Sequence, residues 1–287
     1  MIPNVDNDST VYLNGAYLPL RDARVSVLDR GFIFGDGIYD VAPAYGGKPF
    51  CMADHLARLE RSLAAIDIRC GLGRADWEGI VHKLIAASGL GDCMAYIQVT
   101  RGVAKRDHAF PEGVEPTVFC MVSPFKRPDA KLRQQGLSAI GIPDQRWLRC
   151  DIKSVSMLGN VLARQAAVDA GVDDVIQFRD GHLTEGSAAN IWVVRQGTLM
   201  APLRSRLVLE GIRYGLMEEL ARDCGIPFQA RPITEAEVGS ADELMLTSAT
   251  KEVLPITQYE GRPVADGRPG PVYARLRAAY DEAIAAL

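Results

Sequence analysis

The stretch Trp147–Gln165, WLRCDIKSVSMLGNVLARQ, decides how this chain is interpreted. Its lysine, Lys153, ends an apolar-flanked approach that is typical of a β-strand, and the residues that follow have helical spacing. Ser154 or Ser156 would cap that helix, and Gly171 would end it. The apolar positions of the expected helix are Val155, Leu158, Leu162, Ala163 and Ala166. A lysine at such a junction, kept away from water, has a lowered pKa and a neutral amine that attacks carbonyls. A lysine on the protein surface would give the same pattern.

The composition is that of a soluble globular chain of two domains. Its 287 residues are 48% hydrophobic and 24% charged, and the net charge of −4 does not attract nucleic acid or anionic membranes. No run approaches the roughly 20 apolar residues that span a bilayer, and residues 1–15 do not resemble an export signal. The six cysteines and four histidines lack the spacing of a disulfide framework or a metal site. We therefore expect a cytoplasmic protein that binds no metal, nucleic acid or membrane.

Turn and periodicity signals predict a mixture of strands and helices. Asn14-Gly15 predicts a hairpin within Thr10–Leu20, and apolar spacing predicts a helix over Asp54–Ile66, capped by Asp54. Other expected helices cover 75–88, 209–224 and 271–287, and other strands cover 38–41, 95–100, 117–122, 174–179, 191–195 and 244–246. Two prolines and several basic residues mark 122–130 as a linker between an N-terminal α/β domain, 1–121, and a C-terminal domain, 131–287.

Polar residues at turns and element ends form a candidate site, although each also has an ordinary structural explanation. Glu185 lies in a stretch of small residues, where backbone can approach a ligand closely. The helix that begins at Leu209 and the hydroxyl-rich turn 247–250 offer N–H and O–H donors to a phosphate. Arg106 and His108 lie two residues apart in a loop and suit a carboxylate, with simple solvent exposure as the alternative.

Together these residues meet the needs of pyridoxal phosphate. That cofactor requires a Schiff-base lysine and a partner for its ring nitrogen. Lys153 and Glu185 would supply these two groups, and the glutamate would keep the ring nitrogen protonated so that the ring accepts electrons. The two turns would hold the phosphate.

The chain resembles the fold-type IV pyridoxal-phosphate enzymes, and specifically the bacterial D-amino acid aminotransferases. The matching segments, in family order, are DRGFIFGDGIYDV (29–41), HLARL (55–59), YIQVTRG (96–102), RDHAFP (106–111), RWLRCDIKS (146–154), LGNVLARQ (158–165), LTEGSAANIW (183–192), LEGI (209–212) and DELMLTSAT (242–250). The lysine stretch and the RDH loop favour this branch over the branched-chain L-aminotransferases. The resemblance implies a two-domain α/β (α+β) fold, with the cofactor between the domains and the lysine on a C-terminal pseudo-barrel domain.

The resemblance also implies a role for each matching residue. Lys153 would bind the cofactor as a Schiff base and shuttle the α-proton, and Glu185 would pair with the ring nitrogen. The phosphate would be held by Arg58, the backbone of Ile212 and Arg213, Ser248 and Ala249, with Leu209 bracing the ring. The substrate α-carboxylate would be bound by Tyr39, Arg106 and His108. In this family Arg106 and His108 reach the site of the partner in a homodimer.

Three residues depart from the family pattern. Ala188 replaces a serine near the cofactor, and Ala249 removes a hydroxyl from the phosphate turn. Arg213 replaces a threonine there, and its charge is a candidate for compensating the lost hydroxyls, because charge-assisted bonds to phosphate are strong. None of the three changes touches the lysine, the glutamate or the carboxylate-binding residues.

The expected reaction is ping-pong transamination between a D-amino acid, such as D-alanine, and a 2-oxo acid, 2-oxoglutarate or pyruvate. The alternatives on the same fold are a branched-chain L-amino acid aminotransferase, an (R)-amine transaminase and an aminodeoxychorismate lyase. A non-catalytic binding protein with this fold is a further alternative.

Overall fold

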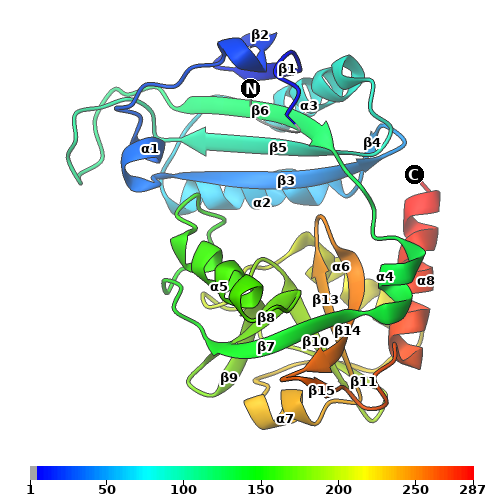
Figure 1. Cartoon of the computed structure of the whole chain (residues 1–287). Coiled ribbons are helices and arrows are strands. Elements are labelled where there is room, and N and C mark those ends of the chain that lie inside the picture. Colours follow the sequence, from blue (N-terminus) through cyan, green and yellow to red (C-terminus); the bar gives the residue numbers. More distant parts are fainter. Residues whose placement is uncertain (1–4) are drawn as a thin grey trace. The chain divides into compact units, whose positions relative to one another are not determined.

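The computed structural model describes residues 5–287. The N-terminal stretch that was examined for an export signal includes residues 1–4, which lie outside the described residues. The chain divides into two compact units. Unit 1 comprises the chain up to Lys126 together with Ile152–Met157, and unit 2 comprises Arg127–Asp151 and Leu158–Leu287. Both units mix strands and helices, which confirms the expected α/β fold class (Figure 1).

The unit boundaries differ from the expected domains in two ways. Strand β6 (Thr117–Pro124) continues into the expected linker 122–130, because its ladder with β5 runs as far as the pair Cys93 and Pro124. The segment Ile152–Met157, which contains Lys153, belongs by its contacts to unit 1 and not to the C-terminal unit. Its backbone pairs with β3, which explains the assignment.

Unit 1 is built on an antiparallel sheet that, in the described residues, has six strands in the order β2-β1-β6-β5-β3-β4 (Figure 1). Its elements, besides β6, are β1 (Thr10–Leu13), β2 (Ala16–Pro19), the 3-10 turn η1 (Leu20–Asp22), α1 (Arg30–Phe34), β3 (Gly37–Tyr45), β4 (Lys48–Pro49), α2 (Met52–Ala65), α3 (Arg74–Ser88) and β5 (Cys93–Thr100). Helix α2 packs against β3, and α3 packs against β1, β5 and β6. The core between sheet and helices includes Leu56, Leu59, Trp77, Leu84 and Ile97.

Local signals in unit 1 predicted most of these elements. The hairpin at Asn14-Gly15 is confirmed, with both residues at positive φ, and α3 ends before Gly89 as expected. The expected cap of α2 is wrong: its N-cap is Cys51, and Asp54 lies in the first turn. An acid at that place interacts favourably with the positive end of the helix dipole, which explains why it resembles a cap in the sequence.

Unit 2 is built on a larger sheet, in the described residues nine-stranded, with the order β12-β11-β10-β13-β14-β7-β8-β9 and β15 beside β14 (Figure 1). Its strands are β7 (Leu137–Pro143), β8 (Asp174–Arg179), β9 (His182–Gly186), β10 (Asn190–Arg195), β11 (Thr198–Ala201), β12 (Phe228–Ala230), β13 (Glu243–Ser248), β14 (Glu252–Tyr259) and β15 (Arg262–Pro263). Its helices are α4 (Ala130–Gln135), α5 (Leu158–Asp169), α6 (Ile212–Asp223), α7 (Glu235–Gly239) and α8 (Pro271–Ala285). Contacts between β9 and β10 show that the sheet curls back on itself.

Two helices of unit 2 begin later than expected. Helix α5 begins at Leu158, because the backbone N–H of Val155 donates to Gly37 at the start of β3. Of the expected apolar positions of α5, Ala163 is buried and Ala166 packs beside it, while Leu158 and Leu162 are more than half exposed. Helix α6 begins at Ile212 with Gly211 as its N-cap, three residues after Leu209.

Candidate active site

The candidate residues fall into two groups, one in each unit. Unit 1 contains Tyr39, Arg58, Arg106, His108 and Lys153. Unit 2 contains the other six, which are Glu185, Leu209, Ile212, Arg213, Ser248 and Ala249.

In unit 1, strand β3 holds the backbone of Lys153. The carbonyl of Lys153 accepts a hydrogen bond from the Tyr39 N–H at 2.9 Å, and Ser154 forms a bridge with Ile38. The half-buried Lys153 side chain places its Nζ atom 4.1 Å from the centre of the Tyr39 ring. The structure therefore brings the predicted lysine and Tyr39 together, with the amine over an aromatic face that attracts a cation.

Arg58 belongs to a buried cluster of charged residues around Asp40 of β3. Its Nε and Nη2 atoms donate to the two carboxylate oxygens of Asp40, each at 2.8 Å, and His55 Nδ1 lies 2.7 Å from Asp40 Oδ1. Burial alone would raise the Asp40 pKa, but the charges of Arg58 and His55 outweigh burial and hold this pKa far below its usual range. The sequence prediction included Arg58 and missed Asp40 and His55. Asp40 directly follows Tyr39, and His55 begins the HLARL segment, so both stand next to residues that were singled out.

Arg106 and His108 lie in the exposed loop between β5 and β6. The His108 ring centre is 5.4 Å from that of Phe34, and the Arg106 guanidinium carbon is also 5.4 Å from the Phe34 ring. The two predicted carboxylate-binding residues therefore meet at one aromatic side chain. Their exposure leaves both accessible to an anion from outside unit 1.

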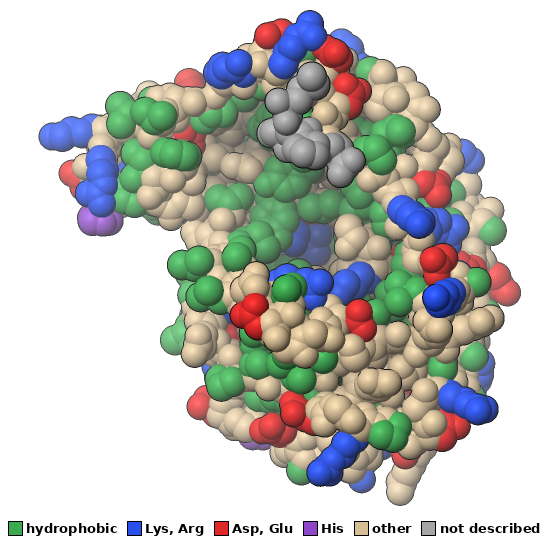
Figure 2. Space-filling view, in the orientation of Figure 1, with side chains coloured by type: hydrophobic (Ala, Val, Ile, Leu, Met, Phe, Trp, Pro, Cys, Tyr) green, Lys and Arg blue, Asp and Glu red, His purple; other side chains and the backbone are tan. Residues whose placement is uncertain are grey.

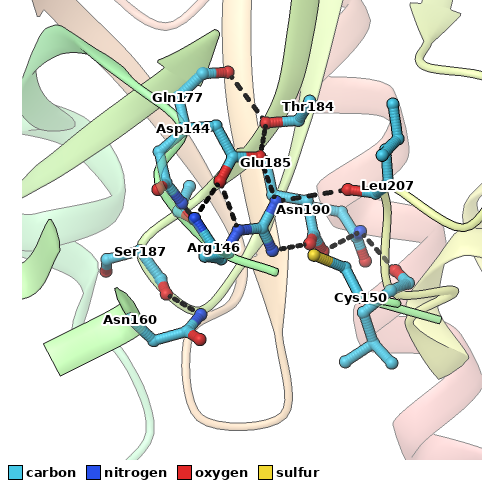
Figure 3. Close-up of polar contacts among 12 residues, drawn as sticks. Asp144, Arg146, Cys150, Asn160, Gln177, Thr184, Glu185, Ser187, Asn190 and Leu207 are labelled. Atoms are coloured by element: carbon cyan, nitrogen blue, oxygen red, sulfur yellow. Dashed lines mark hydrogen bonds and ion pairs between the residues drawn. The ribbon is translucent and has the colours of Figure 1, made fainter. Parts of the chain in front are cut away.

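In unit 2, Glu185 on β9 lies at the centre of a buried polar network (Figure 3). Its side chain is 6% exposed and forms an ion pair with Arg146 Nη1, and Asn190 Nδ2 donates to Glu185 Oε1 at 3.2 Å. Arg146 also donates to both oxygens of Asp144, at 2.8 Å from Nη2 and at 3.0 Å from Nε. Thr184 Oγ1 donates to Asp144 Oδ2 at 2.9 Å.

Each charged group of this network stabilises the ionised form of its neighbour. Burial would lower the Arg146 pKa, but its hydrogen bond to Asp144 and the charge of Glu185 raise that pKa above its ordinary value. Burial likewise would raise the Asp144 pKa, and the hydrogen bond and charge of Arg146 lower it. An arginine in contact favours the ionised form of Glu185. The sequence prediction missed Arg146 and Asp144, although Arg146 begins the quoted segment RWLRCDIKS.

Asn190 connects Glu185 to the start of α6. Its Nδ2 atom also donates to the Leu209 carbonyl at 2.9 Å. A Cβ atom on Gly211 would lie 2.1 Å from Asn190 Oδ1, so this helix cap must be glycine if Asn190 is to keep its place. The backbone N–H groups of Ile212 and Arg213 follow in the first helical turn, where N–H groups lack partners within the helix.

The Arg213 side chain is buried, and its Nε atom donates to the Tyr280 hydroxyl of α8 at 3.2 Å. This contact does not support the expectation that the Arg213 charge compensates the lost hydroxyls of the phosphate turn. What Arg213 offers at the start of α6 is its backbone N–H.

The turn between β13 and β14 contains Ser248 and Ala249. Ser248 Oγ accepts from the Lys251 N–H at 3.0 Å and lies 3.4 Å from Thr250 Oγ1. Lys251 Nζ in turn donates to the buried Asp174 at 2.6 Å. The other oxygen of Asp174 accepts from the Ser187 N–H at 3.1 Å. Asp174 therefore links the turn at Ser248 to the small-residue turn that follows Glu185.

The donor chemistry of unit 2 fits pyridoxal phosphate. An ionised carboxylate beside an arginine accepts a hydrogen bond from a protonated ring nitrogen. The N–H groups at the start of α6 and the hydroxyls at the β13–β14 turn are suitable donors to a phosphate. Residues 5–287 contain no cluster of three or more His, Cys, Asp or Glu placed to bind a metal ion, and none of their helices has both the length and the apolar character to cross a bilayer.

The curled two-unit α/β fold is that of the fold-type IV aminotransferases, and comparison with known proteins agrees. The sequence profile described as amino-transferase class IV matches residues 37–259. The chain belongs to this family and is an aminotransferase. The cofactor of the family is pyridoxal phosphate.

Among curated relatives, D-alanine aminotransferase from Bacillus licheniformis is 36% identical over 274 residues, which is 96% of each chain. Among solved structures, the branched-chain aminotransferase from Thermoproteus uzoniensis with norvaline superposes with a TM-score of 0.87 at 26% identity, covering 96% of this chain and 95% of that one. The branched-chain aminotransferase from Escherichia coli has a TM-score of 0.87 at 21% identity, covering 96% and 93%. The last likeness concerns the fold alone.

Replacing Arg146 by methionine should destabilise unit 2. At pH 7 we expect the free energy of unfolding to fall by about 3–5 kcal/mol, because two buried carboxylates lose a shared cation. The Asp144 pKa is depressed in the folded protein, so its ion pair contributes stability above the unfolded pKa of about 3.9. That contribution disappears as the pH falls through the folded pKa, so the deficit of the variant should shrink below about pH 4.

Urea unfolding between pH 3 and 8 measures this difference. The matched control is Arg149→Met, which removes an exposed ion pair with Asp151 and should leave the free energy of unfolding nearly unchanged. Equal losses in the two variants would contradict the role given to the Arg146 network.

Replacing Gly211 by alanine should weaken cofactor binding. The added methyl group displaces Asn190 from Glu185 and Leu209, and the loss of one such hydrogen bond corresponds to a roughly tenfold increase in the dissociation constant for pyridoxal phosphate. Gly215→Ala is the control in the same helix, since a Cβ atom at Gly215 meets open space. Absorbance titration of the apoprotein measures both. Equal affinities in the two variants would show that the Asn190 contact does not matter.

Proposed function

We propose that this aminotransferase transfers the amino group of a D-amino acid, such as D-alanine, to a 2-oxo acid by a ping-pong reaction. The observation that carries the proposal is the meeting of Arg106 and His108 at Phe34, in the loop that the resemblance assigns to the substrate carboxylate. The curated D-alanine aminotransferases, at 35–36% identity, support the D-amino acid as donor. The six cysteines are free thiols, a form that a reducing cytoplasm maintains.

When bound, pyridoxal phosphate supplies a carbonyl that takes up the substrate's amino group and a ring that accepts the electrons of the broken α-carbon bond. Lys153 would hold the cofactor covalently through its amine. The same amine, when neutral, would accept the proton of the substrate α-carbon. Glu185 accepts the hydrogen bond of the protonated ring nitrogen.

The cofactor's phosphate would be held by backbone and hydroxyl donors. These would be the N–H groups of Ile212 and Arg213 and the groups of Ser248 and Ala249, and the proposal also assigns Arg58 to the phosphate. Leu209 would brace the ring, and Asn190 holds the Leu209 carbonyl in place. The chemistry of these groups supports the assignment, since phosphates bind at helix starts and hydroxyl-rich turns.

Arg106, His108 and Tyr39 bind the substrate carboxylate, and we propose that Arg106 and His108 do so in the site of the partner of a homodimer. Exposed apolar side chains support a second copy of the chain as partner. Phe32 is 75% exposed and Phe110 57% exposed in unit 1, and Leu158 is 71% exposed in unit 2. Side chains of this size are costly to leave in water.

A branched-chain L-aminotransferase is the second candidate, since the similar solved structure from Thermoproteus uzoniensis is a branched-chain aminotransferase. A panel of D- and L-amino acids, followed by the absorbance change of the bound cofactor, distinguishes the two. A response to L-branched-chain substrates alone would replace the proposed substrate. An (R)-amine transaminase would not need Arg106, and a lyase would not return an amino group to a 2-oxo acid.

The first test concerns the lysine and the carboxylate. Borohydride should fix the cofactor on Lys153 in the native protein and not in Lys153→Ala. Arg106→Leu should raise the KM for D-alanine by at least ~10-fold, as expected for a lost charge-assisted hydrogen bond, with little change in cofactor affinity. Absence of fixed cofactor would refute the proposed chemistry. An unchanged KM would refute the carboxylate assignment alone.

The second test concerns the homodimer. Consider a mixed dimer of one Lys153→Ala chain and one Arg106→Leu chain. If Arg106 acts in the partner's site, both defects fall in one of the two sites and the other site is intact. After unfolding and refolding a 1:1 mixture, about a quarter of all sites should regain the native KM. Sedimentation confirms that the mixed species is a dimer. No recovery of native KM would mean that Arg106 serves its own chain.

A further inference from the structure

A triad of Arg30, Asp36 and Arg101 holds the loop between β5 and β6 at the point where the loop begins. Arg30, at the start of α1, is 3% exposed and donates from Nε to Asp36 Oδ2 at 2.7 Å. Arg101, at the start of the loop, donates to the same carboxylate from Nε at 2.8 Å and from Nη2 at 3.1 Å. Burial would raise the Asp36 pKa, and the hydrogen bonds of the two arginines lower it.

Each arginine of the triad also contacts the loop itself. Arg30 Nη1 donates to the Asp107 carbonyl at 2.5 Å, and Nη2 donates to the His108 carbonyl at 3.4 Å. Arg101 lies over the Phe110 ring, 3.5 Å from its centre. The triad therefore contacts the middle of the loop, at Asp107, His108 and Phe110.

Besides the triad, the start of the loop is held by the bridge between Val103 and Asp29 and by the hydrogen bond from the Ala104 N–H to the Leu28 carbonyl. Its residues 105–110 are exposed, and Figure 2 shows basic groups and a histidine gathered over the projecting loop that Figure 1 draws in teal at the left. Exposed loops of this kind are mobile unless their backbone groups are bonded. Hydrogen bonds to the carbonyls of Asp107 and His108 set the direction of the two peptide groups on either side of His108.

We propose that Arg30 is a positioning residue for the substrate carboxylate, held in place by Asp36 and Arg101. This inference rests on the proposed roles of Arg106 and His108. Fixing the loop before substrate arrives removes the entropy cost of ordering it on binding, so it favours donors that carry a carboxylate. Arg30 does not touch substrate or cofactor.

The test compares Arg30→Lys, Arg30→Met and Asp36→Asn with Arg74→Met, which removes an exposed ion pair of unit 1. In the first three holoenzymes the KM for D-alanine should rise, by ~10-fold in Arg30→Met and less in Arg30→Lys, because a charged donor to two carbonyls is lost or shortened. The affinity for pyridoxal phosphate should change by less than ~2-fold, since the lysine segment is held by the main-chain carbonyls of Gly35 and Gly37 and not by the side chains that are replaced. Amide hydrogen exchange in residues 103–110 should become faster.

Arg106→Leu is measured beside them. A raised KM in Arg106→Leu but not in Arg30→Met overturns this inference and leaves the proposed function intact. An unchanged KM in both overturns both. Unchanged hydrogen exchange, or a parallel loss of cofactor affinity and KM, would show that the triad only stabilises unit 1.

Discussion

The backbone pairing of Ile152–Met157 with β3 is the constraint on which the site depends. The chain leaves unit 2 after Asp151, contributes these six residues to unit 1, and returns to unit 2 at Leu158. Main-chain hydrogen bonds on both sides of Lys153 and the buried side chain of Ile152 fix this crossing. A nucleophilic amine is more effective on a fixed backbone than on a free loop, because less ordering is needed when it reacts. The backbone of Lys153 is therefore hydrogen-bonded like that of a strand residue, although Lys153 lies outside the named strands.

Buried carboxylates in the two units are stabilised in the same manner. Asp40, Asp36 and Asp144 each accept two hydrogen bonds from the planar fork of an arginine. A guanidinium suits this use because it stays charged and matches both carboxylate oxygens. Removing one partner of such a pair leaves a buried charge, which is more costly than never having buried the pair. The clusters are thus sensitive to single substitutions, although their net contribution to stability is modest.

Features that depend on neighbouring residues were predictable from the sequence, and features that depend on distant partners were not. The turn at Asn14-Gly15 and the end of α3 at Gly89 follow from the conformational freedom of glycine, and both predictions are confirmed. The late start of α5 depends on a hydrogen bond to Gly37, more than a hundred residues earlier in the chain, which no local pattern reveals.

The candidate site shows the same division. Lys153 and Glu185 were recognisable because they stand in characteristic segments. Arg146 and Asp144 are 39 and 41 residues from Glu185 along the chain, by the numbering, and their role becomes visible only when β7 and β9 are placed in one sheet. The hydrogen bond from Arg213 to Tyr280 of α8 could not be predicted for the same reason, because the two residues lie 67 positions apart in the chain.

In the proposed assignment, the residues that define the reaction class are buried and those that select the substrate are exposed. Glu185, Arg146 and Asp144 are buried and bonded to one another, so a substitution in this group disturbs its neighbours. Arg106 and His108 are exposed on a loop, where side chains change with little effect on the rest of the fold. An aminotransferase fold can therefore keep its chemistry while its substrate changes. This explains how the chain superposes closely on branched-chain aminotransferases at 21–26% identity while its D-alanine relatives share 36%. On the proposed assignment, the substrate preference of this chain depends on the exposed loop and on the triad at its start, and not on the buried network around Glu185.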